Sequence, residues 1–368
     1  MARRSYSFWL KIMEHLYKVF RLFFILFLIF LSSCKQEKVN DISSPVRVIF
    51  DTDIGPDVDD AGAVAVLHSL ADNNEVKILG MVCNITSPWA APCLDALNTY
   101  YGRPDILIGT LKGKGSSGDS PEWSGLTFTK AIAETFPNDL KSGTNAPDAT
   151  YLYRKILNAE KDLEVVIISV GALTNLRNLI HSTPDSISSL TGVELVKRKV
   201  KLLSLMAGNY PKGIRQDPNF SADIEASIEV INRWPTPIVF SGEEIGKEIK
   251  TGTTLFQTKK NNPVRRAYLL WDSHFWPMWD STFKAGQSVH SHDSYDQTSV
   301  LFACRGTKNY WKLSEPGINK VFANGLNEFQ VRKAGKYSYL IESMSPDSLG
   351  KVIDKLMTSE PKITPTDR

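Results

Sequence analysis

Cysteine and histidine are scarce in this chain, with four and six among its 368 residues. Cys83, Cys93 and Cys304 do not have the paired spacing of zinc ligands, which argues against a structural zinc site and against cysteine-based chemistry. A disulfide between Cys83 and Cys93 and a set of three buried thiols both fit the sequence. In either case, the chemistry must come from other side chains.

The chain also lacks a strong excess of either charge, with 43 lysines and arginines against 40 aspartates and glutamates. Residues 1–33 hold five of the basic residues and one of the acidic ones, so the remainder has a formal charge of about −1. This balance leaves no electrostatic footprint for nucleic acid, which we exclude as a partner. No repeat or low-complexity segment divides the remainder, which is long enough for one large or two ordinary domains.

The first 33 residues have the pattern of an export signal. Basic residues precede an apolar run at Leu22–Leu31, which is too short to span a bilayer comfortably as a mature helix. The sequence LSSC that ends at Cys34 resembles the lipobox of bacterial lipoproteins, which implies a lipid on Cys34 and export to the periplasm or cell surface. An uncleaved anchor helix and a plain signal peptide are the alternatives. We expect a lipoprotein signal peptide at 1–33, a polar tether at 34–45 and a folded domain at 46–360.

Buried strands and amphipathic helices alternate along the folded domain. Apolar, β-branched runs are typical of buried strands at 46–50, 76–82, 105–109, 164–170, 201–207 and 236–241. Segments between them place apolar residues at three- and four-residue spacing, as helices do. The pattern predicts an α/β fold with an open, mostly parallel, doubly wound sheet, and a site at the carboxyl ends of its strands.

Five aspartates crowd the ten positions after the first predicted strand: Asp51, Asp53, Asp57, Asp59 and Asp60. Each ionised pair a few ångströms apart repels by roughly 1–4 kcal/mol near a surface, so the cluster needs solvent, protons or a cation. A calcium loop of the EF-hand type is excluded, because Pro56 and Gly62 replace its glycine and glutamate. An aspartate-nucleophile phosphatase fits only Asp51 and Asp53, and a helix cap explains only one or two aspartates. A divalent cation held by hard oxygen ligands explains the cluster best.

The aspartate loop resembles the N-terminal motif of the inosine–uridine preferring nucleoside hydrolases, Asp-Thr-Asp-Pro-Gly-x-Asp-Asp-Ala, with two extra residues before Asp59-Asp60. Three later segments resemble further motifs of the same family, in the family's order: Ser169–Leu176, Asp217–Ser227 and Ser294–Gly306. The resemblance implies a nucleoside hydrolase-like catalytic domain over 46–360. It also implies a protein that commonly forms homodimers or homotetramers.

The resemblance implies calcium-dependent hydrolysis of the N-glycosidic bond of a ribonucleoside or related N-ribosyl compound, with release of the base and ribose. Asp53, Asp60 and Asp296 would bind calcium through carboxylates and Val170 through its carbonyl. Asp53 would also act as general base on the attacking water. The substrate-binding residues would be Asp59, Asn84, Asn209, Asp217 and Asn219.

The sequence departs from the family pattern at three places. Tyr295 stands where the family often has a histidine next to the last metal aspartate, and either His290 or His292 could supply that group; we assign His292 as catalytic. Asp217 replaces a glutamate. The tryptophan-rich segment Trp271–Asp280 either stacks on the base or packs an insertion onto the sheet. These departures leave open a non-catalytic, calcium-dependent ribose- or nucleoside-binding lipoprotein.

Overall fold

The structure is a computed structural model, and it describes residues 44–113 and 128–362. The predicted signal peptide, Cys34 and almost all of the predicted tether lie outside the described residues. The described residues from Pro45 onward form one compact unit.

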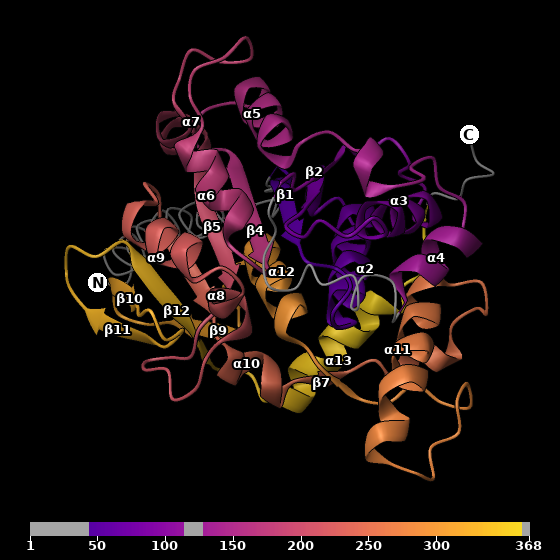
Figure 1. Cartoon of the computed structure of the whole chain (residues 1–368). Coiled ribbons are helices and arrows are strands. Elements are labelled where there is room, and N and C mark those ends of the chain that lie inside the picture. Colours follow the sequence, from indigo (N-terminus) through magenta and orange to yellow (C-terminus); the bar gives the residue numbers. More distant parts are fainter. Residues whose placement is uncertain (1–43, 114–127, 363–368) are drawn as a thin grey trace, which may run out of the picture. The chain divides into compact units, whose positions relative to one another are not determined.

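A ten-stranded sheet runs through this unit (Figure 1). Its parallel part has the order β6-β5-β4-β1-β2-β3. The bounds of these strands are β1 Val46–Thr52, β2 Val76–Cys83, β3 Ile108–Thr110, β4 Val165–Val170, β5 Val200–Met206 and β6 Ile238–Ser241. The predicted strands and the mostly parallel sheet are therefore confirmed, with ends that shift by one to three residues.

The sheet continues past β6 into a C-terminal part that the sequence analysis did not predict. β12 pairs parallel with β6, whereas β9 and β10 pair antiparallel with β12, and β11 pairs antiparallel with β10. The bounds are β9 Trp311–Leu313, β10 Gly317–Val321, β11 Asn327–Val331 and β12 Tyr337–Glu342. A separate two-stranded sheet joins β7 Lys250–Thr251 to β8 His292–Asp293.

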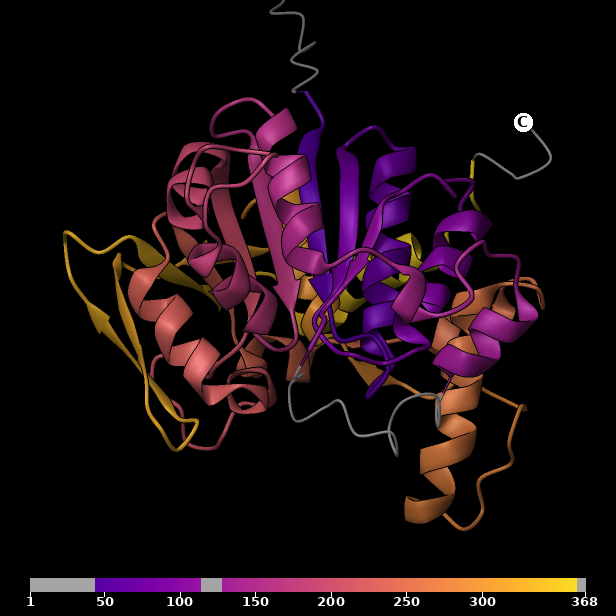
Figure 2. The ribbon, with the colours of Figure 1, turned by 45° about the horizontal axis from the view of Figure 1, so that its top comes forward.

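Helices cover both faces of the sheet (Figure 2). Along β1, Val48 and Phe50 face one apolar core, and Ile49 faces the other. The first core takes residues from α2 Asp59–Asp72, α3 Ala90–Tyr100, α4 Thr129–Thr135, α10 Glu243–Glu248, α11 Pro263–Trp279, α12 Tyr295–Arg305 and α13 Pro346–Met357. The second core takes residues from α5 Ala149–Ala159, α6 Thr174–His181, α7 Gly192–Lys199, α8 Pro218–Ala222 and α9 Ile224–Arg233. Short 3-10 turns lie at η2 Gly143–Asn145 and η3 Thr253–Gln257.

The strand order reverses at β1, which lies between β4 and β2. From β1 the chain first builds outward through β2 and β3, and then returns to the other side of β1 to form β4. Such a switch point opens a crevice at the carboxyl ends of the two central strands, where α/β proteins bind ligands. Asp53 follows β1 and Val170 ends β4, so these two predicted site residues lie at this crevice.

The structure also shows the state of the cysteines and the hydropathy of the helices. Cys83, Cys93 and Cys304 are buried free thiols, so the disulfide alternative is wrong. No helix within residues 44–113 and 128–362 has the length and hydropathy needed to cross a membrane.

Candidate active site

Asp51, near the end of β1, is fully buried and fixed by three donors. The Tyr153 hydroxyl donates to Oδ2 at 2.7 Å, and the side-chain amides of Asn84 and Asn175 donate to Oδ1 at 3.0 and 3.1 Å. Burial raises the pKa of Asp51 to about 7. The donors lie on α5, after β2 and on α6, so Asp51 joins these elements to the end of β1 and orders the backbone that carries Asp53.

Asp53 is partly exposed and lies against the backbone of Gly171. Gly171 has a φ of 120°, and a Cβ at this position would lie 2.6 Å from Asp53 Oδ1. Glycine is required here because it tolerates this φ and lets the loop after β4 approach the carboxylate. Burial, with a smaller contribution from the charge of Asp57, raises the pKa of Asp53 to about 8.

The helices α2 and α12 begin next to each other at the acidic cluster. The carboxylate Oδ2 of Asp59, in the first turn of α2, accepts hydrogen bonds from the backbone N–H groups of Tyr295 and Asp296, both at 3.1 Å. Asp296 is buried in the first turn of α12. Each helix N-terminus stabilises a nearby anion by about 0.3–1 kcal/mol. The stabilisation from the two helix N-termini is smaller than the repulsion among the carboxylates, so the cluster needs further positive charge.

Asp60 is fully buried, like Asp51. The Thr52 hydroxyl donates to its Oδ1, whereas its Oδ2 has no hydrogen-bond partner among the described residues. Burial and the charges of Asp296 and Asp53 raise the pKa of Asp60 well above its usual value. An unsatisfied buried carboxylate is costly, about 1–3 kcal/mol or more, which points to a ligand that supplies positive charge.

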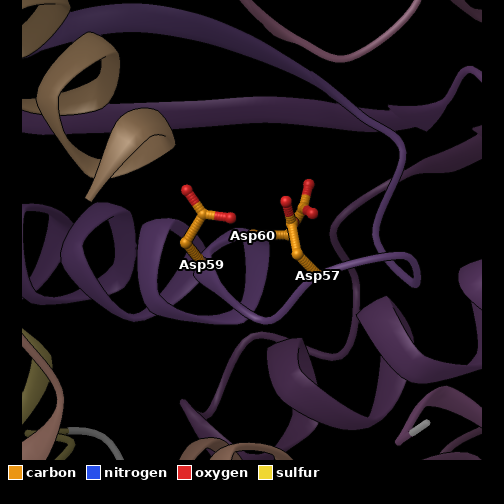
Figure 3. A group of neighbouring side chains, drawn as sticks. All are labelled: Asp57, Asp59 and Asp60. Carbon is orange, nitrogen blue, oxygen red and sulfur yellow. The ribbon is translucent and has the colours of Figure 1, made fainter. Parts of the chain in front are cut away.

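The acidic cluster fits a hard divalent cation. One oxygen from each of Asp57, Asp59 and Asp60 lies within 4.8 Å of the others, and their carboxylates point to the same side (Figure 3). Oxygen-only donor sets are the kind that calcium and magnesium prefer. The structure thus adds Asp57, to which the sequence analysis gave no role. Val170 pairs in register with Thr52, so its backbone lies at the same edge of the sheet.

A cavity of about 170 Å³ lies beside the cluster. Five of the predicted site residues line it: Asp53, Asp59, Asp217, Asn219 and Asp296. The structure therefore brings Asp53 and Asp59, from the N-terminal part of the chain, close to Asp296 and to the first residues of α8. Its remaining lining residues are Pro56, Asp57, Met206, Pro218, Glu243 and Tyr295.

Asp217 and Asn219 are held rigidly in the wall of this cavity. Asp217 caps α8 by accepting the Phe220 N–H at Oδ1 at 2.9 Å, while its buried Oδ2 has no partner among the described residues. Burial raises the pKa of Asp217 to about 6. The Asn219 amide donates to the Met206 carbonyl at 2.8 Å. Both side chains are therefore positioned before a ligand binds.

Asn84 and Asn209 do not line the cavity, and neither do Asp60, Val170 and His292. The Asn84 amide donates to Asp51, which leaves its buried Oδ1 without a partner in the described part of the chain. The backbone of Asn209 bonds to the Asn327 side chain in both directions, at 2.9 Å each. Substrate contacts by Asn84 and Asn209 therefore stay predictions.

A second cavity, of about 390 Å³, adjoins the first and shares Asp57, Asp59 and Tyr295 with it. His292 lies in its wall, with Nε2 2.7 Å from Oδ1 of Asp272. Asp272 is fully buried on α11 and also accepts the His290 N–H at 2.8 Å and the Trp276 indole N–H at 3.0 Å. The catalytic role of His292 stays a prediction, because this histidine lines the second cavity and not the first.

Sequence reasoning missed four supports of the site: Tyr153, Asn175, Glu243 and Asp272. Asn175 belongs to a segment that was recognised, and its role was not. Glu243 lines the first cavity and pairs with Arg215; it follows β6, where the rule of strand carboxyl ends could have found it. Asp272 carried no signal, because only the folded chain places it beside His292.

A larger cavity of about 750 Å³ lies away from the acidic cluster, and none of the predicted site residues lines it. Among the described residues of its wall, Glu360 is the only carboxylate, beside Lys259, Lys260 and Arg266. It offers no oxygen cage for a cation, so we assign the site to the acidic crevice.

Comparison with known proteins identifies the family of the chain. The family model of the inosine-uridine preferring nucleoside hydrolases matches residues 48–310. The chain is similar to a plant nucleoside hydrolase, PpNRh1, with 18% identity, a TM-score of 0.62 and coverage of 86% of this chain and 99% of that one. It is also similar to a purine-preferring ribonucleoside hydrolase from Gardnerella vaginalis, with 15% identity, a TM-score of 0.63 and coverage of 84% and 98%.

A third similar structure is the inosine-uridine preferring nucleoside hydrolase from Bacillus anthracis, with 15% identity, a TM-score of 0.58 and coverage of 85% and 99%. The search of curated proteins found no match. At these identities the solved structures show a shared fold, and the family model shows membership over most of the chain. The chain therefore belongs to the family of inosine–uridine preferring nucleoside hydrolases, which are hydrolases that act on N-glycosyl bonds.

Proposed function

We propose that the protein hydrolyses the N-glycosidic bond of a ribonucleoside or related N-ribosyl compound, and that calcium is its metal. The observation that carries this proposal is the buried Oδ2 of Asp60, which has no hydrogen-bond partner among the described residues and belongs to a cluster of carboxylates beside a cavity of about 170 Å³. Asp53, Asp60, Asp296 and the Val170 carbonyl are the proposed ligands. Calcium supplies Lewis acidity toward water and an anchor for sugar hydroxyls when it is bound.

Asp53 is the proposed general base. It is partly exposed in the cavity wall, its position is fixed against Gly171, and its neighbour Asp51 is held by three donors. A base must lie within hydrogen-bond reach of the proton that it accepts, and a carboxylate at the cavity surface meets this condition. The neighbouring carboxylates also favour the positive charge that develops on the sugar as the bond breaks.

The ribose would lie between Asp59 on one side and Asp217 and Asn219 on the other. Asp59 and Asp217 are buried acceptors, and Asn219 is an amide anchored to the Met206 carbonyl. Acceptors and amides of this kind bind sugar hydroxyls without rearrangement. Asn84 and Asn209 are proposed as further contacts to the substrate.

A non-catalytic ribose- or nucleoside-binding protein is the second candidate, and one contact favours it. The Tyr295 hydroxyl donates to Asp293 Oδ2 at 2.7 Å, and burial with this hydrogen bond raises the pKa of Tyr295. The residue at the family's histidine position is therefore a poor proton donor to a leaving base. His292, which lies in the adjoining cavity, is the proposed replacement.

The experiment that separates the two candidates uses the full chain with calcium and a panel of nucleosides, and measures reducing sugar. We expect hydrolysis by the wild type and a loss of about 100- to 10,000-fold in kcat for Asp53→Asn, because the proton moves in the transition state. Asp347→Asn, an exposed change in the first turn of α13, is the matched control. Calcium-dependent nucleoside binding without turnover in the wild type would establish the binding protein.

We also propose a lipid on Cys34, export to the periplasm or cell surface, and a homodimer or homotetramer. The sequence LSSC supports the first two, and the family resemblance supports the third.

A further inference from the structure

The second cavity has walls of an unusual composition. Three tryptophans, Trp271, Trp276 and Trp279, line it together with His292, Tyr295 and the carboxylates of Asp57 and Asp59. Its volume of about 390 Å³ is more than twice that of the first cavity. Because the two cavities share Asp57, Asp59 and Tyr295, a ribose in the first would direct its aglycone into the second.

The tryptophans form a connected group around α11. Trp271 and Trp279 have ring centroids 6.1 Å apart, and Trp276 meets Trp279 edge-on at 5.6 Å. Trp279 is 64% exposed, so packing in the core does not explain its presence. The lower end of α11 stands clear of the neighbouring elements (Figures 1 and 2).

Three carboxylates, from Asp57, Asp59 and Asp293, lie in the wall of this second cavity. Among the described residues of the wall, Lys250 is the only lysine or arginine, and it is already paired with Asp293. The first cavity beside it is lined by six carboxylates, from Asp53, Asp57, Asp59, Asp217, Glu243 and Asp296. Aromatic faces next to carboxylates attract flat cations through both the ring quadrupole and direct Coulomb attraction.

We infer that the substrate of this site is an N-ribosyl aromatic cation, of which an N-ribosylpyridinium is the simplest form. This inference rests on the proposed hydrolase function. It also removes the need for a leaving-group acid, a role that Tyr295 fills poorly because its hydroxyl donates to Asp293.

The reaction balances without a proton donor to the leaving group. Water forms the new bond to C1′ through its oxygen, and its proton goes to Asp53. The C1′–N bond breaks, and its electron pair stays on the ring nitrogen. That nitrogen is positive in the substrate, so the aglycone departs as a neutral pyridine, whereas a neutral nucleoside would release an anion unless it were protonated.

Binding of the aglycone alone gives a test that does not depend on turnover. The probes are the N-methylnicotinamide cation and uncharged nicotinamide, followed by tryptophan fluorescence of the full chain with calcium. We expect quenching by the cation at concentrations at least about 10-fold lower than by nicotinamide, and an affinity about 3- to 10-fold weaker for Trp279→Leu. Met278→Ala is the control, because Met278 is 67% exposed on the same helix and does not line the cavity. Equal affinity for the two probes would overturn the inference.

Turnover provides the second test. Nicotinamide riboside should have a kcat/KM at least about 10-fold above those of inosine, uridine and the uncharged dihydronicotinamide riboside. Hydrolysis of the uncharged compounds at an equal or higher kcat/KM would overturn this inference and leave the proposed hydrolase intact. Absence of hydrolysis of every compound would instead refute the proposed function, and the fluorescence result would still decide whether the second cavity binds cations.

Discussion

Replacing Asp60 by asparagine tests the cation site most directly. The change keeps the size of the side chain and one oxygen, and removes the charge of the carboxylate whose Oδ2 has no partner in the described chain. At 4.8 Å, the distance that encloses the oxygens of Asp57, Asp59 and Asp60, two unit charges repel by about 3.5 kcal/mol at an effective dielectric constant of 20. Partial protonation lowers this figure, since the pKa values of Asp59 and Asp60 are raised.

The assay is thermal unfolding of the full chain in chelator and in calcium. Calcium at 100 times its dissociation constant should stabilise the wild type by about 2.7 kcal/mol, or roughly 5 °C at about 2 °C per kcal/mol. Asp60→Asn should lose most of this response, and in chelator it should unfold at or above the wild-type temperature, because less repulsion remains. Asp347→Asn should respond like the wild type. A wild-type protein shown to be metal-free that gains nothing from calcium, or an Asp60→Asn protein that gains as much as the wild type, would refute the reasoning.

Three further predictions concern other parts of the chain. Gly171→Ala should abolish most of the activity because its Cβ would displace Asp53, whereas Gly306→Ala, where φ is 64° and no atom lies within 4 Å of the added Cβ, should keep it; equal kcat values in the two variants would contradict this. The pKa of His68 is lowered to about 3 by burial, so its neutral form stabilises the fold above pH 6.5, and this contribution is lost as the pH falls toward 3, by up to about 1.4 kcal/mol per pH unit. Urea unfolding of His68→Gln should therefore depend less on pH between 7 and 5 than that of the wild type, and identical slopes would count against the assignment. Cys34→Ser should abolish lipid labelling and leave an uncleaved precursor on a gel, and unchanged labelling would remove the lipoprotein proposal.

The sequence predicted those parts of the molecule that a run of consecutive residues is enough to identify. β1 and the loop after it were recognisable because a buried apolar run ends in aspartates, and the parallel orientation of β1, β4 and β5 follows from alternation with helices. The segment Ser294–Gly306, which carries Asp296 in the first turn of α12, was recognised from its resemblance to a family motif.

Contacts across long separations could not be predicted in the same way. The Tyr153 hydroxyl reaches Asp51 over 102 residues, and the Asp272 carboxylate reaches His292 over 20 residues through the turn after α11. Nothing in the local pattern around Tyr153 or Asp272 distinguishes them from ordinary helix residues. The strands β9 to β12 were missed for another reason, because they are only three to six residues long and strands this short carry a weak alternation of apolar and polar residues.

The meeting of α2 and α12 has a consequence for the order of events during synthesis. Asp59 accepts its two backbone hydrogen bonds from residues 236 and 237 positions later in the chain. An emerging chain therefore exposes an incomplete acidic loop until α12 has been made and docked, and loop closure over this length is slow. A divalent ion that takes Asp296 as a ligand therefore cannot complete its proposed coordination until α12 has docked. Tight binding of the ion would instead indicate that the C-terminal third of the protein has been made and that α12 has docked.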